Sequence, residues 1–276
     1  MRRFFTARPA VHLALIAYTL LAILPILLIL MNSFKSRSAI FGAPLSLPTA
    51  STFSLGGYVS VLAKANFTLY FANSLIVTVG SLLLVLLFAA MASWAITEYR
   101  FRFNTIVALY LAIGIMVPIR LGSVSILKLM VTLGLVNTLP ALILVYTAMG
   151  LPLAIFILSE FIQQIPREMR DAARIDGASE YRIFWNVILP LIRPAVATVA
   201  VFTMVPIWND LWFPLILAPG KSTQTVTLGV QQFIGQYVTD WNAVLAALSL
   251  ALAPILVLYV VFSRSLVRGI TAGAVK

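Results

Sequence analysis

Long uncharged apolar runs limit what this chain can fold into more than any other feature. Residues 65–97 contain no charged side chain, and five other stretches are predominantly apolar. These stretches cover residues 11–31, 105 onward, 141–162, 194–217 and 242–262. A helix needs about 20 apolar residues to cross a bilayer, and lipid tolerates only backbones that pair all their own polar groups. Because the short alternating segments of a membrane barrel are absent, the sequence predicts an all-α protein with six transmembrane helices.

The composition agrees with a membrane protein. The chain is 62% hydrophobic and 10% charged, with a mean hydropathy of +1.04. Soluble domains carry roughly a quarter charged residues. The connecting segments are too short to hold hydrophobic cores of their own, so we expect a single transmembrane domain over residues 1–276.

The position of the basic residues predicts the orientation. The net charge of +11 could suggest a nucleic acid partner. With the six runs as spans, however, 13 of the 19 basic residues lie on the side of both termini and five on the other, and Arg120 lies within the third run. Basic residues are enriched in cytoplasmic loops. We therefore expect cytoplasmic termini, membrane lipid around the spans, and no nucleic acid partner.

Several kinds of chemistry are excluded by residue type. The chain has no cysteine and a single histidine, His12, so it has no disulfide, no thiolate nucleophile and no site of several histidines for a metal. Gly220-Lys221-Ser222 is not a phosphate-binding loop, because that motif needs an earlier glycine where this chain has Leu215. We predict no catalytic residue, no metal and no cofactor in this chain.

A polar segment at residues 165–190 interrupts the apolar runs. It holds four of the eight acidic residues and four arginines. These are Glu168, Asp171, Asp176 and Glu180 with Arg167, Arg170, Arg174 and Arg182. Such a segment between two spans must lie in water, on the cytoplasmic side in the expected orientation.

Within this segment the local chemistry predicts a helix, a break and a second helix. Pro166 suits a first helical position, Gly177 suits the left-handed residue after a helix end, and Ser179 suits an N-cap. Further on, four apolar residues share one stripe of the second helix. They are Tyr181, Phe184, Trp185 and Ile188. Pro190 and Pro194 are expected to end that helix and redirect the chain.

The spacing in this segment resembles the EAA loop of ABC importer permeases. Asp171-Ala172-Ala173 is followed after three residues by Gly177, and after nine more by Val187-Ile188-Leu189-Pro190. The family pattern is E-A-A-x3-G-x9-I-x-L-P, so Asp171 replaces a glutamate and Val187 an isoleucine. The alternative is an ordinary amphipathic loop in which the alanines serve helix propensity.

Other short matches, spread over the whole chain, resemble the carbohydrate-uptake branch of that family, similar to the maltose-system G subunit. They are Asn32-Ser33-Phe34-Lys35, Asn73-Ser74, Asp176-Gly177-Ala178, Trp208-Asn209 and Gly273-Ala274-Val275-Lys276. Each match is short, and their order along the chain carries the resemblance.

The resemblance implies a non-catalytic permease subunit in a bacterial inner membrane, importing a sugar or oligosaccharide by alternating access. It implies three partners: a pair of ATPase subunits that bind ATP and Mg²⁺, a second permease, and an extracytoplasmic sugar-binding protein. We expect the second permease to be a different chain, and the sequence leaves pairing with a second copy of this chain open. The polar segment would be the coupling helix that docks on the ATPase. Its candidate coupling residues are Arg167, Glu168, Asp171, Ala172, Ala173, Asp176 and Gly177.

In that coupling helix, Asp171 is placed to pair with Arg167 and Arg174, one turn away on either side. Ala172 and Ala173 would let the helix seat closely in a groove of the partner.

A second candidate site lies in the apolar runs, where charges are costly and usually face a cavity or a partner. It consists of Arg120, Trp208, Asn209 and Asp210. Aromatic faces with amides or carboxylates suit a sugar, so these residues are candidates for the substrate path. The alternatives are an arginine that reaches water at the end of its span and an interfacial tryptophan beside a polar pair that fixes helix packing.

Two other functions remain open from the residues alone. An ion-coupled secondary transporter would need intramembrane carboxylates or an internal repeat. Only Asp210 and Glu160 lie near apolar runs, and no clear repeat is present. A membrane scaffold that does not transport would need only a cytoplasmic partner for the polar segment.

Overall fold

The computed structural model describes residues 3–64, 66–99, 101–234 and 239–272. Their regular structure is helical, with two isolated antiparallel bridges, Lys35 with Phe53 and Ile234 with Thr239. The all-α fold class is therefore confirmed. The chain divides into two compact units, residues 1–68 with 229–253 and residues 69–228 with 254–276. The expectation of one domain over residues 1–276 stays a prediction.

The first unit contains a long apolar helix and a folded loop. Its elements are α1 (Arg3–Ser33), α2 (Arg37–Gly42), α3 (Gly56–Lys64), η3 (Gln231–Phe233) and the first part of α14 (Trp241–Ala272). Lys35 is buried, and its ammonium donates to the carbonyls of Ala43 at 2.9 Å and Pro44 at 3.3 Å. Gly57 packs against α14 so closely that a Cβ would lie 2.2 Å from the carbonyl oxygen of Asn242. Only glycine fits there.

The second unit contains both candidate sites. Its elements are α4 (Phe67–Glu98), α5 (Asn104–Met116), η1 (Ile119–Gly122), α6 (Ser123–Thr132), α7 (Leu139–Gln163), α8 (Arg167–Ile175), α9 (Glu180–Ile183), the π-helix η2 (Phe184–Ile188), α10 (Leu189–Leu191), α11 (Arg193–Asn209), α12 (Trp212–Leu217) and α13 (Val226–Val230). Helix α4 begins in the first unit, α13 ends in it, and α14 continues from it into the second.

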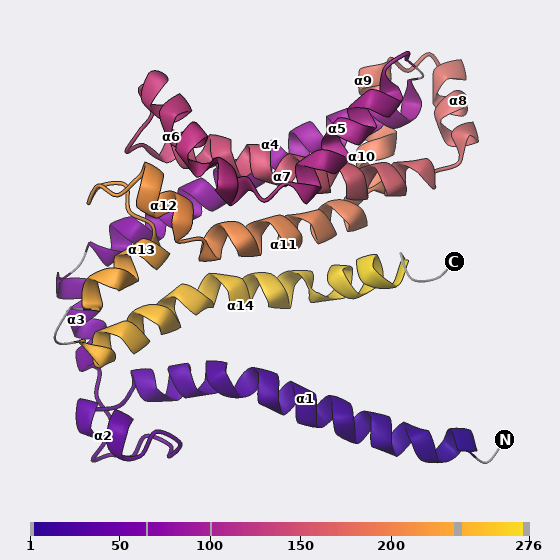
Figure 1. The fold of residues 1–276 in the computed structure, drawn as a ribbon. Helices are drawn as coiled ribbons and strands as arrows, with labels where there is room; N and C mark the ends of the chain where they lie inside the picture. The colour runs from indigo at the N-terminus through magenta and orange to yellow at the C-terminus, as the bar shows by residue number, and fades with distance from the viewer. Residues whose placement is uncertain (1–2, 65, 100, 235–238, 273–276) are drawn as a thin grey trace. The chain divides into compact units, whose positions relative to one another are not determined.

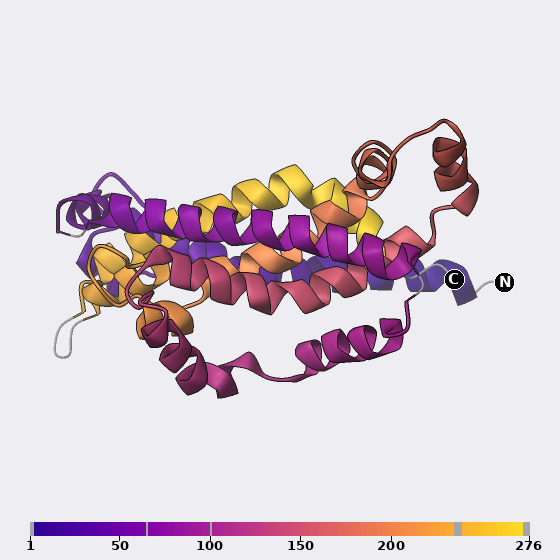
Figure 2. The ribbon, with the colours of Figure 1, turned by 90° about the horizontal axis from the view of Figure 1, so that it is seen from above.

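Helix α7 is the centre of the second unit. It packs against α5 and α11, and α4 runs alongside it in both views (Figures 1 and 2). Two hydroxyls of α4 donate to carbonyls of α7, Ser81 to Ile143 at 3.4 Å and Ser93 to Ile155 at 3.1 Å. Helix α8 lies beyond one end of α7, whereas α6 and α12 lie at the other end (Figures 1 and 2). The two candidate sites are therefore at opposite ends of α7.

Two hydrophobic clusters fill the second unit along α7. Near α8, residues of α4, α7, α11 and the segment from α9 to η2 pack together, among them Ala89, Leu158, Ile162, Ile183, Ile188 and Val199. Near α12, a second cluster includes Val77, Leu142, Tyr146, Ile207, Phe213 and Leu217. Because α7 supplies residues to both, it joins the two ends.

Three described helices are long and apolar enough to cross a membrane, over Pro9–Ser33, Phe67–Glu98 and Leu139–Gln163. Two pairs of shorter helices, each bent at a short break, add two further spans if each pair is counted as one span. They are Asn104–Met116 with Ile119–Thr132 and Glu180–Leu191 with Arg193–Asn209. The membrane-protein prediction is thus supported, and the count of six spans stays a prediction.

The third and fifth runs are broken where we expected continuous helices. The third bends by 88° between Met116 and Ile119, where Val117 and Pro118 are extended because a proline disfavours helical geometry in the residue before it. The fifth ends at Asn209, and α12 starts only at Trp212. Asp210 is extended between them, and its carboxylate accepts a hydrogen bond from the backbone amide of Phe213 at 3.0 Å. Aspartate often forms such side-chain-to-backbone bonds, which compete with the hydrogen bonds of a continuous helix. The bend of 73° before Arg193 agrees with the redirection expected at Pro190 and Pro194.

Candidate functional site

The segment from α8 to α9 folds as its local chemistry predicts. Gly177 has φ +76°, its amide donates to the carbonyl of Arg174 at 3.0 Å, and that of Ala178 donates to Ala173 at 3.0 Å. This left-handed pattern closes the carbonyl end of α8. A Cβ at Gly177 would meet no atom within 4 Å, so the backbone conformation, rather than space, requires glycine. The N-cap at Ser179 is also confirmed, since its hydroxyl accepts from the amide of Arg182 at 3.4 Å.

Two details of this segment differ from the prediction. Pro166 is extended, with ψ 137°, and caps α8 from outside, so the first helical residue is Arg167. The apolar stripe is divided: Phe184 and Ile188 are buried, whereas Tyr181 and Trp185 are exposed. The π-helix over Phe184–Ile188 explains this, because its wider turn changes which face each side chain takes.

A cluster of charges, the Glu98 cluster, joins α8 to the end of α4. It consists of Glu98, Tyr99, Arg170, Arg174 and Glu180. Arg170 donates through Nη1 to Oε2 of Glu98 at 2.5 Å, and Arg174 donates through Nη2 to Oε1 of the same carboxylate. Residues four apart share a helix face, so two successive turns of α8 hold both oxygens of one carboxylate.

Arg174 extends the cluster to α9. Its Nε donates to Oε1 of Glu180 at 2.8 Å and its Nη1 to Oδ1 of Asp171 at 3.0 Å. The hydrogen bond to Glu180, followed by that to Glu98, raises the pKa of the Arg174 guanidinium. Tyr99 donates to Oε2 of Glu180 at 3.0 Å, and burial raises the pKa of its hydroxyl above the usual range. Arg174 thus stays charged and ties together α4, α8 and α9.

Arg170 is the one buried residue of α8. Its guanidinium lies over the ring of Trp94, 5.8 Å from the centroid, and its Nη2 donates to the carbonyl of Ile165 at 3.3 Å. Within the described part of the chain, its Nε has no hydrogen-bond partner. A buried guanidinium is costly unless paired, so the position of α8 depends on Glu98.

The predicted coupling residues divide into two groups. Six of them are exposed on α8 and the turn after it: Arg167, Glu168, Asp171, Ala172, Asp176 and Gly177. Ala173 is half-buried and packs against the hydrophobic cluster near α8. The expected pair of Asp171 with Arg174 is confirmed at 3.0 Å, whereas none of the ion pairs among the described residues joins Asp171 to Arg167.

The second candidate site, the Asp210 cluster, lies at the other end of α7. Arg120 donates through Nη2 to Oδ1 of Asp210 at 3.3 Å. The Tyr146 hydroxyl donates to Oδ2 of Asp210 at 2.8 Å, and the Thr227 hydroxyl donates to its carbonyl oxygen at 2.7 Å. Asp210 is 7% exposed, whereas the Arg120 side chain is 68% exposed. A buried, fixed carboxylate therefore holds an arginine that is open to its surroundings.

The other two predicted path residues point elsewhere. Trp208 is buried against Phe71, with ring centroids 5.6 Å apart. Asn209 is exposed, and its amide donates to the carbonyl of Val205 at 3.0 Å. The structure therefore brings together Arg120 and Asp210, whereas the ring of Trp208 packs against Phe71.

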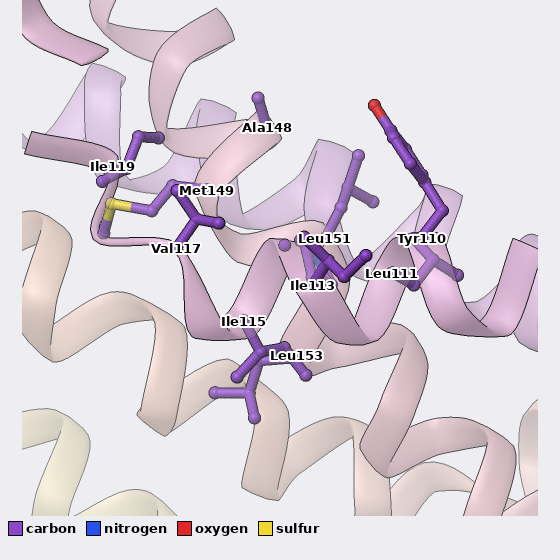
Figure 3. A pocket seen from close by; sticks show the side chains of 12 residues that line it. Tyr110, Leu111, Ile113, Ile115, Val117, Ile119, Ala148, Met149, Leu151 and Leu153 are labelled. Carbon is purple, nitrogen blue, oxygen red and sulfur yellow. The ribbon is translucent and has the colours of Figure 1, made fainter. Parts of the chain in front are cut away.

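A third feature is an apolar cavity of about 700 Å³ between α5 and α7. Figure 3 shows its lining side chains, where the Tyr110 hydroxyl points away from the others. The remaining lining residues are apolar, for example Leu111, Ile115, Met149 and Leu153. Such a lining suits hydrocarbon rather than sugar hydroxyls, which need convergent polar groups.

The residues that could hold a metal are few. Among the described residues, no group of three or more histidine, cysteine, aspartate or glutamate side chains is placed to do so. The expectation that this chain holds no metal or cofactor stays a prediction.

Sequence reasoning missed the two partners that organise these clusters. Glu98 contacts Arg170 from 72 positions away, and Tyr146 contacts Asp210 from 64 positions away. The available signal for Glu98 was its place at the end of a run without any charge. Tyr146 gave none, because a tyrosine in an apolar helix is common.

Comparison with known proteins supports the resemblance. The family model "Binding-protein-dependent transport system inner membrane component" matches residues 7–272. The diacetylchitobiose uptake system permease protein NgcG of Streptomyces coelicolor is 34% identical over 96% of this chain and 88% of that protein. The probable starch degradation products transport system permease protein AmyC of Thermoanaerobacterium thermosulfurigenes is 34% identical over 95% of this chain and 94% of that protein.

A solved structure supports the fold. One chain of a bacterial ABC transporter involved in the import of alginate superposes with a TM-score of 0.80 at 22% identity, over 95% of this chain and 96% of that chain. The family match sets aside the ion-coupled secondary transporter and the scaffold, and it confirms the resemblance drawn from the EAA spacing. This chain belongs to the family of inner membrane components of binding-protein-dependent transport systems.

Proposed function

We propose that this chain is the permease subunit of an ATP-driven importer for a sugar or small oligosaccharide, and that α8 receives the force of ATP hydrolysis. The sugar class is supported by relatives named for diacetylchitobiose, starch degradation products and arabinooligosaccharides. The observation that carries the coupling role is the exposed face of α8, held at a fixed angle by the Gly177 turn and the Glu98 cluster.

In this mechanism the chain itself catalyses nothing. A separate pair of ATPase subunits binds ATP and Mg²⁺ and closes on α8. The exposed coupling residues form the docking face, and Ala172 presents no bulk that would hold the partner away. A second permease completes the path, and an extracytoplasmic binding protein delivers the sugar. Both termini lie in the cytoplasm with α8, in agreement with the distribution of basic residues.

The substrate path passes the Asp210 cluster. An exposed guanidinium beside a buried carboxylate can donate to sugar hydroxyls while its own position is held from behind. Asn209 directly precedes Asp210 in the chain and is exposed, and the amide hydrogen that it does not donate to Val205 can also donate to a sugar. Trp208 contributes by packing against Phe71 rather than by stacking on a sugar.

The test of the coupling role replaces Gly177 by leucine. A side chain strains the left-handed backbone at φ +76° and changes the angle between α8 and α9. Sugar uptake into proteoliposomes that contain the whole complex is expected to fall about tenfold or more relative to ATP hydrolysis, since coupling free energies of about 1–3 kcal/mol correspond to such factors. The radiolabelled probes are diacetylchitobiose, maltose and arabinotriose.

The chain offers a matched control. Gly134 also has a left-handed backbone, at φ +68°, and a Cβ there would also meet nothing within 4 Å. It lies between α6 and α7, away from α8. Gly134→Leu should cause similar backbone strain but leave the ratio of uptake to hydrolysis unchanged. Normal uptake by Gly177→Leu contradicts the coupling role, and failure of wild-type complex to take up any probe contradicts the sugar class.

A further inference from the structure

Helix α4 is built differently from the other long helices of the second unit. It runs for 32 residues from Phe67 to Glu98 without a proline. By contrast, α7 contains Pro152 and α11 contains Pro206. Proline removes a helix hydrogen bond and marks a place where a helix bends. Helix α4 therefore suits a rigid connection better than its neighbours.

One polar end of α4 holds α8. Helix α8 has little apolar packing of its own, because Arg170 is its one buried residue. It is joined to α7 by the non-helical residues 164–166 and to α9 by the glycine turn. Glu98 receives two of the three guanidiniums of α8, those of Arg170 and Arg174, and its side chain is 12% exposed. A displacement of α8 is thus resisted first by α4.

The other polar end of α4 holds the segment after α12. The amide of Asn73 donates to the carbonyls of Ser222 and Gln224, both at 2.9 Å. The Ser74 hydroxyl accepts from the amide of Val226 at 2.9 Å. Both side chains are buried. These bonds fix residues 222–226 to a helix whose far end lies about 38 Å away, at 1.5 Å per residue from Asn73 to Glu98.

That segment in turn reaches the Asp210 cluster. Thr227 follows Val226 directly, and its hydroxyl donates to the carbonyl of Asp210 at 2.7 Å. Thr227 therefore holds the break between α11 and α12, and its neighbour Val226 is fixed to α4 by Ser74. The described residues thus connect α8 to Arg120 through ion pairs, hydrogen bonds and the peptide bond between Val226 and Thr227, and α4 is the longest element of this connection.

We propose that Glu98, Asn73 and Ser74 are positioning residues that make α4 the mechanical link between the coupling helix and the Asp210 break. This proposal rests on the coupling function proposed above for α8. It assigns the transmission of motion to α4, rather than to α7, which directly precedes α8 in the chain but contains Pro152. When α8 moves, α4 moves with it, and the pull on residues 222–226 shifts the Asp210 cluster.

The experiment measures motion at the far end directly. The chain has no cysteine, so Leu121→Cys places one spin label next to Arg120 in the chain and Lys221→Cys places a second next to residues 222–226, both at exposed positions. With the partner subunits made free of cysteine, electron paramagnetic resonance measures the distance between the labels in the complete complex. ATP with vanadate is expected to change that distance in the labelled parent protein.

Glu98→Gln, which removes the charge that holds α8, should abolish most of this change. ATP hydrolysis and co-purification with the ATPase should be retained. The ratio of uptake to hydrolysis should fall about tenfold, within the range of roughly 5–150-fold that site-to-site coupling typically spans. The matched control is Glu160→Gln, an exposed acid on α7 that no ion pair among the described residues joins to α8. It should behave like the parent protein.

Asn73→Ala tests the opposite end of the link and does not depend on the stability of the Glu98 cluster. It should reduce the distance change as Glu98→Gln does, and the double variant should be no worse than either single variant, because links in series are not additive. A parent protein whose labels do not respond to ATP would contradict the proposed coupling function itself. A responsive parent with unaltered Glu98→Gln and Asn73→Ala variants would overturn only the role of α4.

Discussion

The Glu98 cluster and the Asp210 cluster each contain a carboxylate that receives an arginine, but they are constructed in opposite ways. Glu98 uses both oxygens for guanidiniums, and with Arg170 it forms a pair in which the side chains are 12% and 6% exposed. Asp210 gives one oxygen to Tyr146 and the backbone of Phe213, and its arginine is held by a single contact at 3.3 Å. Arg170 is shielded in the first cluster, whereas Arg120 is free to turn outward in the second.

The difference shows that the surroundings of an ion pair decide what it can do. A buried pair with several hydrogen bonds is difficult to separate without a large cost, which suits a joint that transmits force. An exposed arginine on a fixed carboxylate contributes little to stability and can exchange its partner for a ligand. The two ends of α7 therefore combine a rigid joint with an adaptable site.

The largest expected effect is at the rigid joint. Arg170→Ala removes the buried partner of Glu98 and the cation over the ring of Trp94. Removing one member of a buried pair costs about 3–5 kcal/mol, and we expect a loss of that order in the free energy of unfolding, measured in detergent by chemical denaturation. Arg167→Ala, at an exposed position on the same helix, is the control and should change stability by less than about 0.5 kcal/mol. Equal effects of the two substitutions would contradict the description of a rigid joint.

A smaller effect is expected at the fixed carboxylate. Tyr146→Phe removes the hydroxyl that donates to Oδ2 of Asp210 at 2.8 Å and keeps the ring packed near Phe213. A hydrogen bond to a charged group contributes about 1.5–3 kcal/mol, and the same denaturation measurement should show a loss in that range. Tyr110→Phe is the control, because this tyrosine is 75% exposed. A loss no greater than that of the control would mean that Asp210 is held by its backbone contacts alone.

The helix end and the cap between α8 and α9 could be predicted from the sequence, whereas the long-range contacts of both sites could not. The spacing around Gly177 predicts the left-handed turn and the cap at Ser179, because a helix end is determined by a few neighbouring residues. The contact of Glu98 with α8 depends on how α4 and α7 pack, and no nearby residue records that. The stripe from Tyr181 to Ile188 has the right period for an α-helix, yet the π-helix redistributes its faces.

The breaks in the spans were only partly predictable from the sequence. Val117-Pro118 contains its own signal, since proline disfavours a helical residue before it, and the bend of 88° follows there. Asp210 offers a weaker signal, because an aspartate in an apolar run can either pair with a cation or cap a helix, and here it does both. Apolar runs alone therefore predict membrane helices well, but they do not show where a run is divided.

The smallest effect on stability, and the sharpest distinction between the two clusters, is expected for Arg120→Ala. Its side chain is 68% exposed and makes one contact with Asp210, so solvent screening leaves a contribution of about 0–1 kcal/mol to the free energy of unfolding. Uptake should nevertheless fall if the guanidinium donates to the sugar, and the loss should appear as a raised KM. Arg120→Lys keeps the charge but not the planar donor geometry, so it should recover only part of the affinity. Unchanged uptake by Arg120→Ala would mean that this arginine has no role in the path. The Asp210 cluster would then serve only to hold the start of α12, through the hydrogen bond from the backbone of Phe213 to the Asp210 carboxylate.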